Sequence, residues 1–234
     1  STRTMTLTTG KLIAFEGIDG AGKGTQMELL IDFLNKVGIK CIEFSFPQYE
    51  SAFGQVVGKY LRGEFGDLYQ ISPYLSALPY ALDRFQARGA IIDHLEKGFV
   101  IIMDRYVGSN VAHQSARLPI NQRDEFARWL STVEYDYLGM PREDLTLYLR
   151  IPSQIGYKMV EKKAQRSYMS ASRDIHETDS TYQNEVAQVF DHLAESNDCW
   201  MTISTTNAAG QLMGKDTIHL AVVEAIKNQL GISV

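Results

Sequence analysis

The sequence contains little cysteine and no excess of positive charge. Only two of its 234 residues are cysteines, Cys41 and Cys199, too few for a disulfide framework or a cysteine-rich metal site. Both lie in apolar stretches, so we expect them to be small buried side chains. Lys and Arg number 23 against 28 Asp and Glu, a formal net charge of −5. This balance argues against a nucleic-acid partner, and anionic ligands must instead meet local groups of cations.

The chain also lacks a long apolar run and an N-terminal leader. No stretch reaches the length of about 20 apolar residues that a membrane-spanning helix needs. The first residues do not form a charged segment followed by an apolar one, which is the pattern of a secretory signal. We therefore expect no membrane association and a cytoplasmic location. Residues 1–10 are expected to form a tail, the first four resembling an addition ahead of Met5.

A glycine-rich segment directly follows the first apolar run, residues 12–15. Gly17, Gly22 and Lys23 have the spacing of a phosphate-binding loop that leads from a strand into a helix. Small residues let consecutive backbone N–H groups surround phosphate oxygens, and the lysine and the helix N-terminus add positive charge. The residues predicted to bind ATP are Gly17, Ile18, Asp19, Gly20, Ala21, Gly22, Lys23, Gly24 and Thr25.

Strand and helix patterns alternate along the chain. Short apolar runs predict strands at residues 12–15, 41–46, 99–104, 145–150 and 200–203. Helical spacing and capping signals predict helices over residues 23–37, 53–61, 72–97, 107–118, 122–137, from 153 onward, 179–195 and 215–230. We predict an α/β, three-layer P-loop NTPase fold, in which helices flank a parallel five-stranded sheet. Residues 11–234 would form one domain, with ligands beyond the carboxyl ends of the strands.

One segment is basic, rich in hydroxyl groups and poor in core residues. It covers residues 162–176 and contains Lys162, Arg166 and Arg173. We interpret this segment as a mobile lid whose cations close over a bound phosphate. An ordinary solvated charged loop would have the same composition.

Taken together, the motifs resemble those of the thymidylate kinases, a family of nucleoside monophosphate kinases. The resemblance rests on residues 15–23, Phe46-Pro47, and residues 81–84, 104–112 and 173–177. It covers nearly the whole chain from Lys11 onward, and the Asp-Arg-Tyr segment with the Ser-Asn after it is the most specific part. The resemblance implies transfer of the γ-phosphoryl group of ATP to dTMP, with Mg²⁺ as cofactor and a homodimeric assembly.

The resemblance also implies roles for individual residues. Lys23 would hold the β- and γ-phosphates, and Arg105 would bind the phosphate of dTMP. Some family members have an arginine in the P-loop where this chain has Gly20. Members without it resemble the subgroup in which a lid arginine contacts the transferring group. The residues expected to be catalytic are Lys23, Asp19, Asp104, Arg105, Arg166 and Arg173. The residues expected to bind dTMP are Asp19, Phe46, Pro47, Tyr80, Arg84, Arg105, Ser109, Asn110 and His113.

Three positions depart from the usual pattern. Gly24 stands where a P-loop normally has the Ser or Thr that contacts Mg²⁺, so Thr25 and Asp104 are the predicted metal ligands. Ser45 precedes Phe-Pro where many thymidylate kinases have an arginine. His113 stands where some relatives have a tyrosine against the sugar. Gln48 and Tyr49 could contact the acceptor in place of the arginine missing at Ser45, or be turn residues. Ser109 and Gln114 are weaker candidates for the acceptor site, since either could serve only to cap a helix.

Two other functions remain open from the sequence. A related kinase for another nucleotide or deoxynucleoside would share the fold and the donor site, with different base-reading residues. A P-loop ATPase or GTPase switch would act through a partner protein instead. The sequence contains no Asn-Lys-x-Asp guanine-reading motif, and a second anion site has no use in a simple switch.

Overall fold

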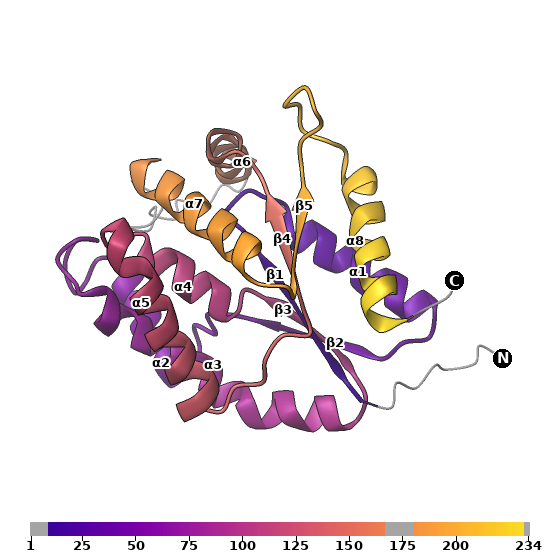
Figure 1. Cartoon of the computed structure of the whole chain (residues 1–234), viewed down its shortest axis with the longest axis horizontal. Helices are drawn as coiled ribbons and strands as arrows, with labels where there is room; N and C mark the ends of the chain where they lie inside the picture. The colour runs from indigo at the N-terminus through magenta and orange to yellow at the C-terminus, as the bar shows by residue number, and fades with distance from the viewer. Residues whose placement is uncertain (1–8, 167–179, 232–234) are drawn as a thin grey trace.

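The computed structural model describes residues 9–166 and 180–231, which form a parallel sheet between two layers of helices (Figure 1). The strands are β1 (Lys11–Glu16), β2 (Cys41–Ser45), β3 (Val100–Asp104), β4 (Leu145–Arg150) and β5 (Trp200–Ser204). They follow the order β2-β3-β1-β4-β5, and every pairing is parallel. The carboxyl ends of all five strands therefore lie at one edge of the sheet. The predicted fold class is confirmed.

Helices cover both faces of this sheet (Figure 1). They are α1 (Lys23–Lys36), α2 (Ala52–Leu61), α3 (Pro73–Glu96), α4 (Val107–Ser115), α5 (Ile120–Ser131), α6 (Ser153–Arg166), α7 (Ser180–Ser196) and α8 (Lys215–Leu230). Alternate side chains of β1 belong to different cores, as expected of a strand buried on both faces. Ile13 and Phe15 belong to the cluster that includes residues of α1 and α8, whereas Leu12 and Ala14 belong to the cluster with residues of α3, α4 and α5.

Helix α3 is the longest helix of the structure, and the sequence explains both of its ends. It begins at Pro73, where the missing N–H group is not needed for a helical hydrogen bond. It ends before Gly98, whose φ of 78° is readily adopted by glycine. The buried face of this helix includes Asp83 and Arg84, so the helix carries polar side chains toward the interior.

The main differences from the sequence predictions concern one helix, the lid segment and the two cysteines. The helix predicted over residues 122–137 is two segments, α5 and a π-helix, η1 (Thr132–Tyr137). Helix α6 continues through Arg166, so the first residues of the predicted lid are helical, because Lys, Ala, Gln and Arg favour helices. Residues 167–176 of the predicted lid lie outside the described residues. The prediction that Cys41 and Cys199 are buried is wrong, since both are half-buried at or beside edge strands.

Across residues 9–166 and 180–231, no helix combines the length and the apolar character that crossing a bilayer requires.

Candidate active site

The loop between β1 and α1 depends on its glycines. Gly17, Gly20 and Gly22 have φ values of 142°, 82° and 88°, which side chains rarely tolerate. A Cβ atom on Gly17 would lie 2.6 Å from the carbonyl oxygen of Leu149, and one on Gly20 would lie 2.3 Å from that of Gly156. The loop therefore packs directly against the end of β4 and the first turn of α6, with no room for a side chain at either position.

Lys23 lies inside this loop. Its Nζ donates hydrogen bonds of 3.0 Å to the carbonyl oxygens of both Gly17 and Ile18, and the residue is 8% exposed. Burial lowers the pKa of Lys23 to about 8, and the positive charge of Arg105 acts in the same direction. The negative charges of Asp19 and Asp104 counteract part of this effect. Lys23 thus places a positive charge inside the loop, bonded to the loop's own carbonyl oxygens.

Arg105 links the loop to the start of α4. Its backbone has a φ of 64°, unusual for a side chain other than glycine, and its N–H donates to the carbonyl oxygen of Phe15 at 3.1 Å. Nη1 donates to Gly17 O at 3.1 Å and to Ser109 Oγ at 3.0 Å, and Nη2 donates to Asp19 Oδ1 at 2.6 Å. These bonds orient the planar guanidinium, the group best suited to bind a phosphate with two parallel hydrogen bonds.

Three acidic side chains surround these cations. Burial raises the pKa of Asp19, but the charges of Arg105 and Lys23 outweigh burial and hold that pKa well below its usual range. Burial raises the pKa of Glu16, which accepts hydrogen bonds from Tyr106 N at 2.8 Å and Ser109 N at 3.0 Å. Glu16 therefore fixes the start of α4 against β1. Asp104 lies half-buried at the end of β3, and its side chain has no hydrogen-bond partner in the described part of the chain.

A cavity of about 230 Å³ adjoins Arg105 and Asp19. It is lined by Asp19, Phe46, Pro47, Tyr49, Leu61, Tyr80, Arg84, Arg105, Ser109, Asn110, His113 and Gln114. All nine residues predicted to bind dTMP are among them, although they come from the P-loop, the segment after β2, helix α3, the turn after β3 and helix α4. Tyr49 and Gln114, which were weaker candidates from the sequence, also line it, and Leu61 was not among the candidates. The fold thus gathers one separate site beside the phosphate-binding loop.

One wall of this cavity contains a buried ion pair. Arg84 is 2% exposed, and its Nε donates to Oε2 of Glu134 at 3.0 Å, while its Nη2 donates to Oε1 of the same carboxylate. Sequence reasoning missed Glu134. The available signal was Arg84 itself, since a buried guanidinium requires a buried acid.

Two amide side chains of α4 complete the wall, and each has one end fixed. Asn110 Nδ2 donates to Ala77 O at 3.0 Å and to Glu134 Oε1 at 2.9 Å. Its buried Oδ1 has no hydrogen-bond partner within the described ranges. Since a buried polar atom without a partner is costly, this oxygen points to a ligand that donates a hydrogen bond.

Gln114 is fixed through its side-chain oxygen, whereas Asn110 is fixed through its NH₂ group. Its Oε1 accepts hydrogen bonds from Ser76 Oγ at 2.6 Å and from Arg117 Nη2 at 2.7 Å. Its buried Nε2 has no partner among residues 9–166 and 180–231. Asn110 thus presents an acceptor, and Gln114 presents a donor, in a cavity that both residues line.

His113 faces the same cavity as a neutral side chain. Its Nδ1 lies 2.8 Å from the carbonyl oxygen of Ser109, so the proton is on Nδ1, which donates to that oxygen. Burial lowers the pKa of His113 to about 4, and the charge of Arg105 contributes in the same direction. The imidazole therefore adds no positive charge to the site at neutral pH.

The remaining predicted residues are placed as follows. Thr25 is exposed in the first turn of α1. Arg166 ends α6, but its side chain lies outside the described part, and Arg173 lies wholly outside it.

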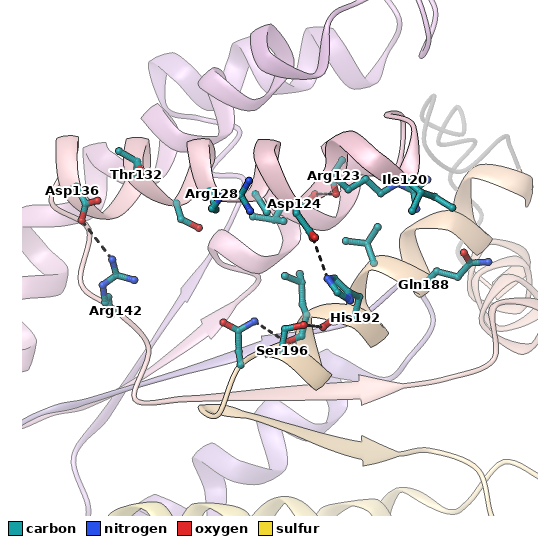
Figure 2. Close-up of a pocket in the computed structure, with 17 residues that line it drawn as sticks. Ile120, Arg123, Asp124, Arg128, Thr132, Asp136, Arg142, Gln188, His192 and Ser196 are labelled. Carbon is teal, nitrogen blue, oxygen red and sulfur yellow. Dashed lines mark hydrogen bonds and ion pairs between the residues drawn. The ribbon is translucent and has the colours of Figure 1, made fainter.

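A second cavity of about 830 Å³ lies between α5 and α7 (Figure 2). A contact of 3.1 Å between Asp124 Oδ1 and His192 Nε2 joins the two helices, and Arg142 Nη2 lies 3.5 Å from Asp136 Oδ1 of η1. Thr132 also lines this cavity. None of the residues predicted as site residues lines it, so the predicted chemistry belongs to the first cavity.

The structure has a phosphate-binding loop with its lysine, and next to it a cavity with its own arginine. These features are typical of P-loop kinases, which transfer a phosphoryl group from a bound donor to a bound acceptor. The comparisons with known proteins agree. The family model for thymidylate kinase matches residues 15–216. The chain is 34% identical over 207 residues to thymidylate kinase from Mycobacterium tuberculosis, covering 86% of this chain and 94% of that protein. It is 30% identical over 229 residues to thymidylate kinase from Caenorhabditis elegans, covering 94% and 91%.

A solved structure of thymidylate kinase from Candida albicans has the same fold. It superposes with a TM-score of 0.71 at 21% sequence identity, covering 94% of this chain and 92% of that chain. The chain belongs to the thymidylate kinase family. The family predicted from the sequence motifs is confirmed, and with it a kinase that acts on nucleotides.

Proposed function

We propose that this chain transfers the γ-phosphoryl group of ATP to dTMP and releases ADP and dTDP. The observation that carries the proposal is the cavity beside the P-loop, which is lined by all nine residues expected to bind dTMP. Arg105 both lines this cavity and bonds to the loop carbonyl of Gly17, so an acceptor phosphate on Arg105 would lie next to the donor phosphates. That arrangement is what direct transfer between two phosphates requires.

Positioning and charge neutralisation account for the chemistry. The phosphate of a nucleoside monophosphate has a second pKa of about 6, so it is already ionised and nucleophilic at neutral pH. No side chain needs to remove a proton, and we assign Asp19 to orienting Arg105, with which it is paired. Lys23 would donate to the β- and γ-oxygens, and Arg105 to the acceptor phosphate. Arg166 and Arg173 stay the proposed lid cations.

The polar wall suits the edge of a pyrimidine with two carbonyl groups. Nη1 of Arg84 has no hydrogen-bond partner among the described residues and is a donor, Asn110 Oδ1 is an acceptor, and Gln114 Nε2 is a donor. Thymine offers the complementary set, with a carbonyl oxygen on each side of its N3–H group. Cytosine has an amino group in place of one of these carbonyls, so a donor of the wall would face a donor of the base.

We further propose that Thr25 and Asp104 hold Mg²⁺. The hydroxyl of Thr25 is exposed, and the carboxylate of Asp104 has no hydrogen-bond partner in the described part of the chain. No cluster of three or more His, Cys, Asp and Glu side chains that could hold a metal occurs within that part. Few protein ligands are needed, since nucleotide-bound Mg²⁺ takes most of its ligands from phosphates and water. When bound, the ion would neutralise charge on the transferring group.

A homodimer is part of the proposal. Leu75, Leu78, Leu82, Phe85 and Ile92 follow one another on α3 at spacings of three, four or seven residues, the pattern of a helix face that packs on another helix. Leu75 is 64% exposed and Phe85 is 42% exposed. A face of this kind supports association with a second copy of the chain.

We expect the double substitution Leu75→Glu with Phe85→Glu to give monomers, because charges on this face oppose its burial. Light scattering coupled to size-exclusion chromatography measures the mass directly. Leu220→Glu is the control, since Leu220 is 70% exposed on α8, in the other helical layer. A wild-type protein that is monomeric, or a double variant that stays dimeric, would contradict this interface.

Two further proposals concern the location of the protein and the kind of ligand that it binds. We propose a cytoplasmic location, with which the free state of Cys41 and Cys199 agrees, since a reducing compartment keeps thiols unpaired. We also propose that the ligands are nucleotides and that nucleic acid is not a partner, in line with the net charge of −5.

Steady-state phosphoryl transfer from ATP with Mg²⁺ to dTMP, dUMP, UMP, dCMP, dGMP and AMP tests the proposed function. We expect kcat/KM for dTMP to exceed that for dCMP by at least about tenfold, given the polar wall. The same assay across Mg²⁺ concentrations should show a higher requirement in Thr25→Val. Preference for another monophosphate would support the related-kinase reading, and ATP hydrolysis without transfer would support the switch.

A further inference from the structure

Glu134 is a fully buried carboxylate in the π-helical segment η1. Segments of π-helix are rare in proteins, and those that occur are often found at functional sites. Neither the phosphate-binding loop nor Arg105 is among its hydrogen-bond partners. Within the described residues, the Glu134 side chain accepts hydrogen bonds from Arg84 and Asn110, and both line the cavity of about 230 Å³, here called the acceptor cavity.

The contacts of Glu134 determine how both partners are turned. Its Oε2 accepts from Arg84 Nε, and its Oε1 accepts from Arg84 Nη2 and from Asn110 Nδ2. A carboxylate only accepts hydrogen bonds, so donors must face it. Arg84 is thus held by one edge of its guanidinium, which leaves Nη1 for other contacts. Asn110 is held by its NH₂ group, which leaves Oδ1 without a partner in the described structure.

We propose that Glu134 is a positioning residue that sets the donor and acceptor pattern of the acceptor cavity, and with it the preference for a pyrimidine dione over cytosine. The inference rests on the proposed function, since it concerns the base of the same acceptor. Glu134 touches no reacting atom in this account. It acts through Arg84 and Asn110, whose remaining polar atoms would read the base.

A purely structural role would have a different signature. A buried ion pair contributes little net stability compared with apolar residues of similar size, and breaking one by removing a partner is strongly destabilising. Such destabilisation would lower the activity toward all monophosphates alike. A change in the ratio between dTMP and dCMP is therefore the readout that separates positioning from stability.

Glu134→Gln is the decisive variant because it keeps the shape and removes one acceptor. In one orientation, the remaining side-chain oxygen faces Arg84 Nη2 and Asn110, and the new NH₂ group faces the Nε–H of Arg84, so two donors face each other. The reverse orientation places the NH₂ group against Nη2 and Asn110 Nδ2. In both orientations Arg84 loses a hydrogen bond, and its guanidinium is no longer held in one position. The wall then loses its fixed donor, the group that would favour a carbonyl over an amino group.

We expect kcat/KM for dTMP to fall about tenfold to a hundredfold in Glu134→Gln, mainly through KM, since the contacts of Lys23 and Arg105 are unchanged. The ratio of kcat/KM for dTMP to that for dCMP should fall by at least about tenfold. Asp136→Asn is the matched control, because it makes the same chemical change in η1. Asp136 faces the cavity between α5 and α7, with its side chain 62% exposed and paired with Arg142 (Figure 2). This variant should keep the wild-type ratio.

A second variant, Glu134→Asp, tests the inference even if Glu134→Gln does not fold. Glu134→Asp keeps both acceptor oxygens and the charge but is one methylene shorter, so we expect a raised KM for dTMP with most of the dTMP preference retained. An unchanged ratio in a folded Glu134→Gln would overturn the inference, as would equal loss of the ratio in Glu134→Asp. Wild-type protein in the same assay keeps the two proposals apart, because failure to phosphorylate dTMP there would count against the proposed function itself.

Discussion

Arg105→Ala is expected to lower kcat/KM for dTMP about a thousandfold, as removal of a preorganised charged donor does at other phosphoryl and oxyanion sites. The substitution removes the hydrogen bonds from Nη1 to Gly17 O and Ser109 Oγ and from Nη2 to Asp19. It also leaves the Asp19 carboxylate without its main counter-charge next to the acceptor phosphate. Steady-state kinetics with ATP and dTMP would measure the loss, and thermal unfolding would show that the fold is kept.

Three companion variants make this result interpretable. Arg105→Lys keeps the charge without the planar fork, so its kcat/KM should lie between those of wild type and Arg105→Ala. Adding Asp19→Asn to Arg105→Ala should recover about tenfold, since it removes the repulsion between two anions. Arg142→Ala, at an arginine whose side chain is 66% exposed, should leave the activity unchanged. A loss of less than tenfold in Arg105→Ala would mean that another cation holds the acceptor phosphate.

Gly20→Ala should cost about 3 kcal/mol of the free energy of unfolding, through backbone strain and a steric clash. Its φ is 82°, and the new Cβ would lie 2.3 Å from O, 3.0 Å from C and 3.1 Å from Cα of Gly156. These are backbone atoms, so the first turn of α6 would have to move away from the loop. Urea unfolding followed by circular dichroism measures the change.

Gly22→Ala is the matched control for the clash. Gly22 has a similar φ of 88°, but nothing lies within 4 Å of the Cβ position, so only the conformational cost of about 1 kcal/mol applies. The difference between the two variants is therefore the cost of moving α6. Equal destabilisation would show that α6 shifts at no cost and that its contact with the loop is loose.

Most of the fold could be predicted because the patterns that specify it are local. The last helix, residues 215–230, was predicted with the bounds that the structure shows, since its apolar spacing and Gly231 are visible in the sequence. The π-helix at Thr132–Tyr137 could not be predicted, because six residues are too few for the apolar spacing to distinguish it from an α-helix. Cys199 was misplaced for a related reason: it stands in the turn before β5, where apolar composition does not report burial.

The candidate site was predictable where its residues form contiguous motifs. Residues 17–25 and 104–113 each carry several of its members, and the fold brings these segments together. The partner of Arg84 was not predictable, since Glu134 lies 50 residues away in a stretch with no motif. The orientation of Asn110 and Gln114 was equally hidden, because it depends on Ala77, Ser76 and Arg117, which no sequence pattern marks.

The two halves of the site differ in how far along the chain their contacts reach. Lys23 bonds to carbonyls five and six residues before it, whereas the acceptor wall is held by pairs that are 33, 38 and 50 residues apart. Contacts between separate elements depend on how those elements dock, so a local opening that moves one element breaks them while contacts within a short segment can persist. Fidelity toward the base therefore depends on the tertiary stability of α3, α4 and η1. The contacts of Lys23 lie within one short stretch, so we expect binding of the donor phosphates to be less sensitive to how α3, α4 and η1 dock.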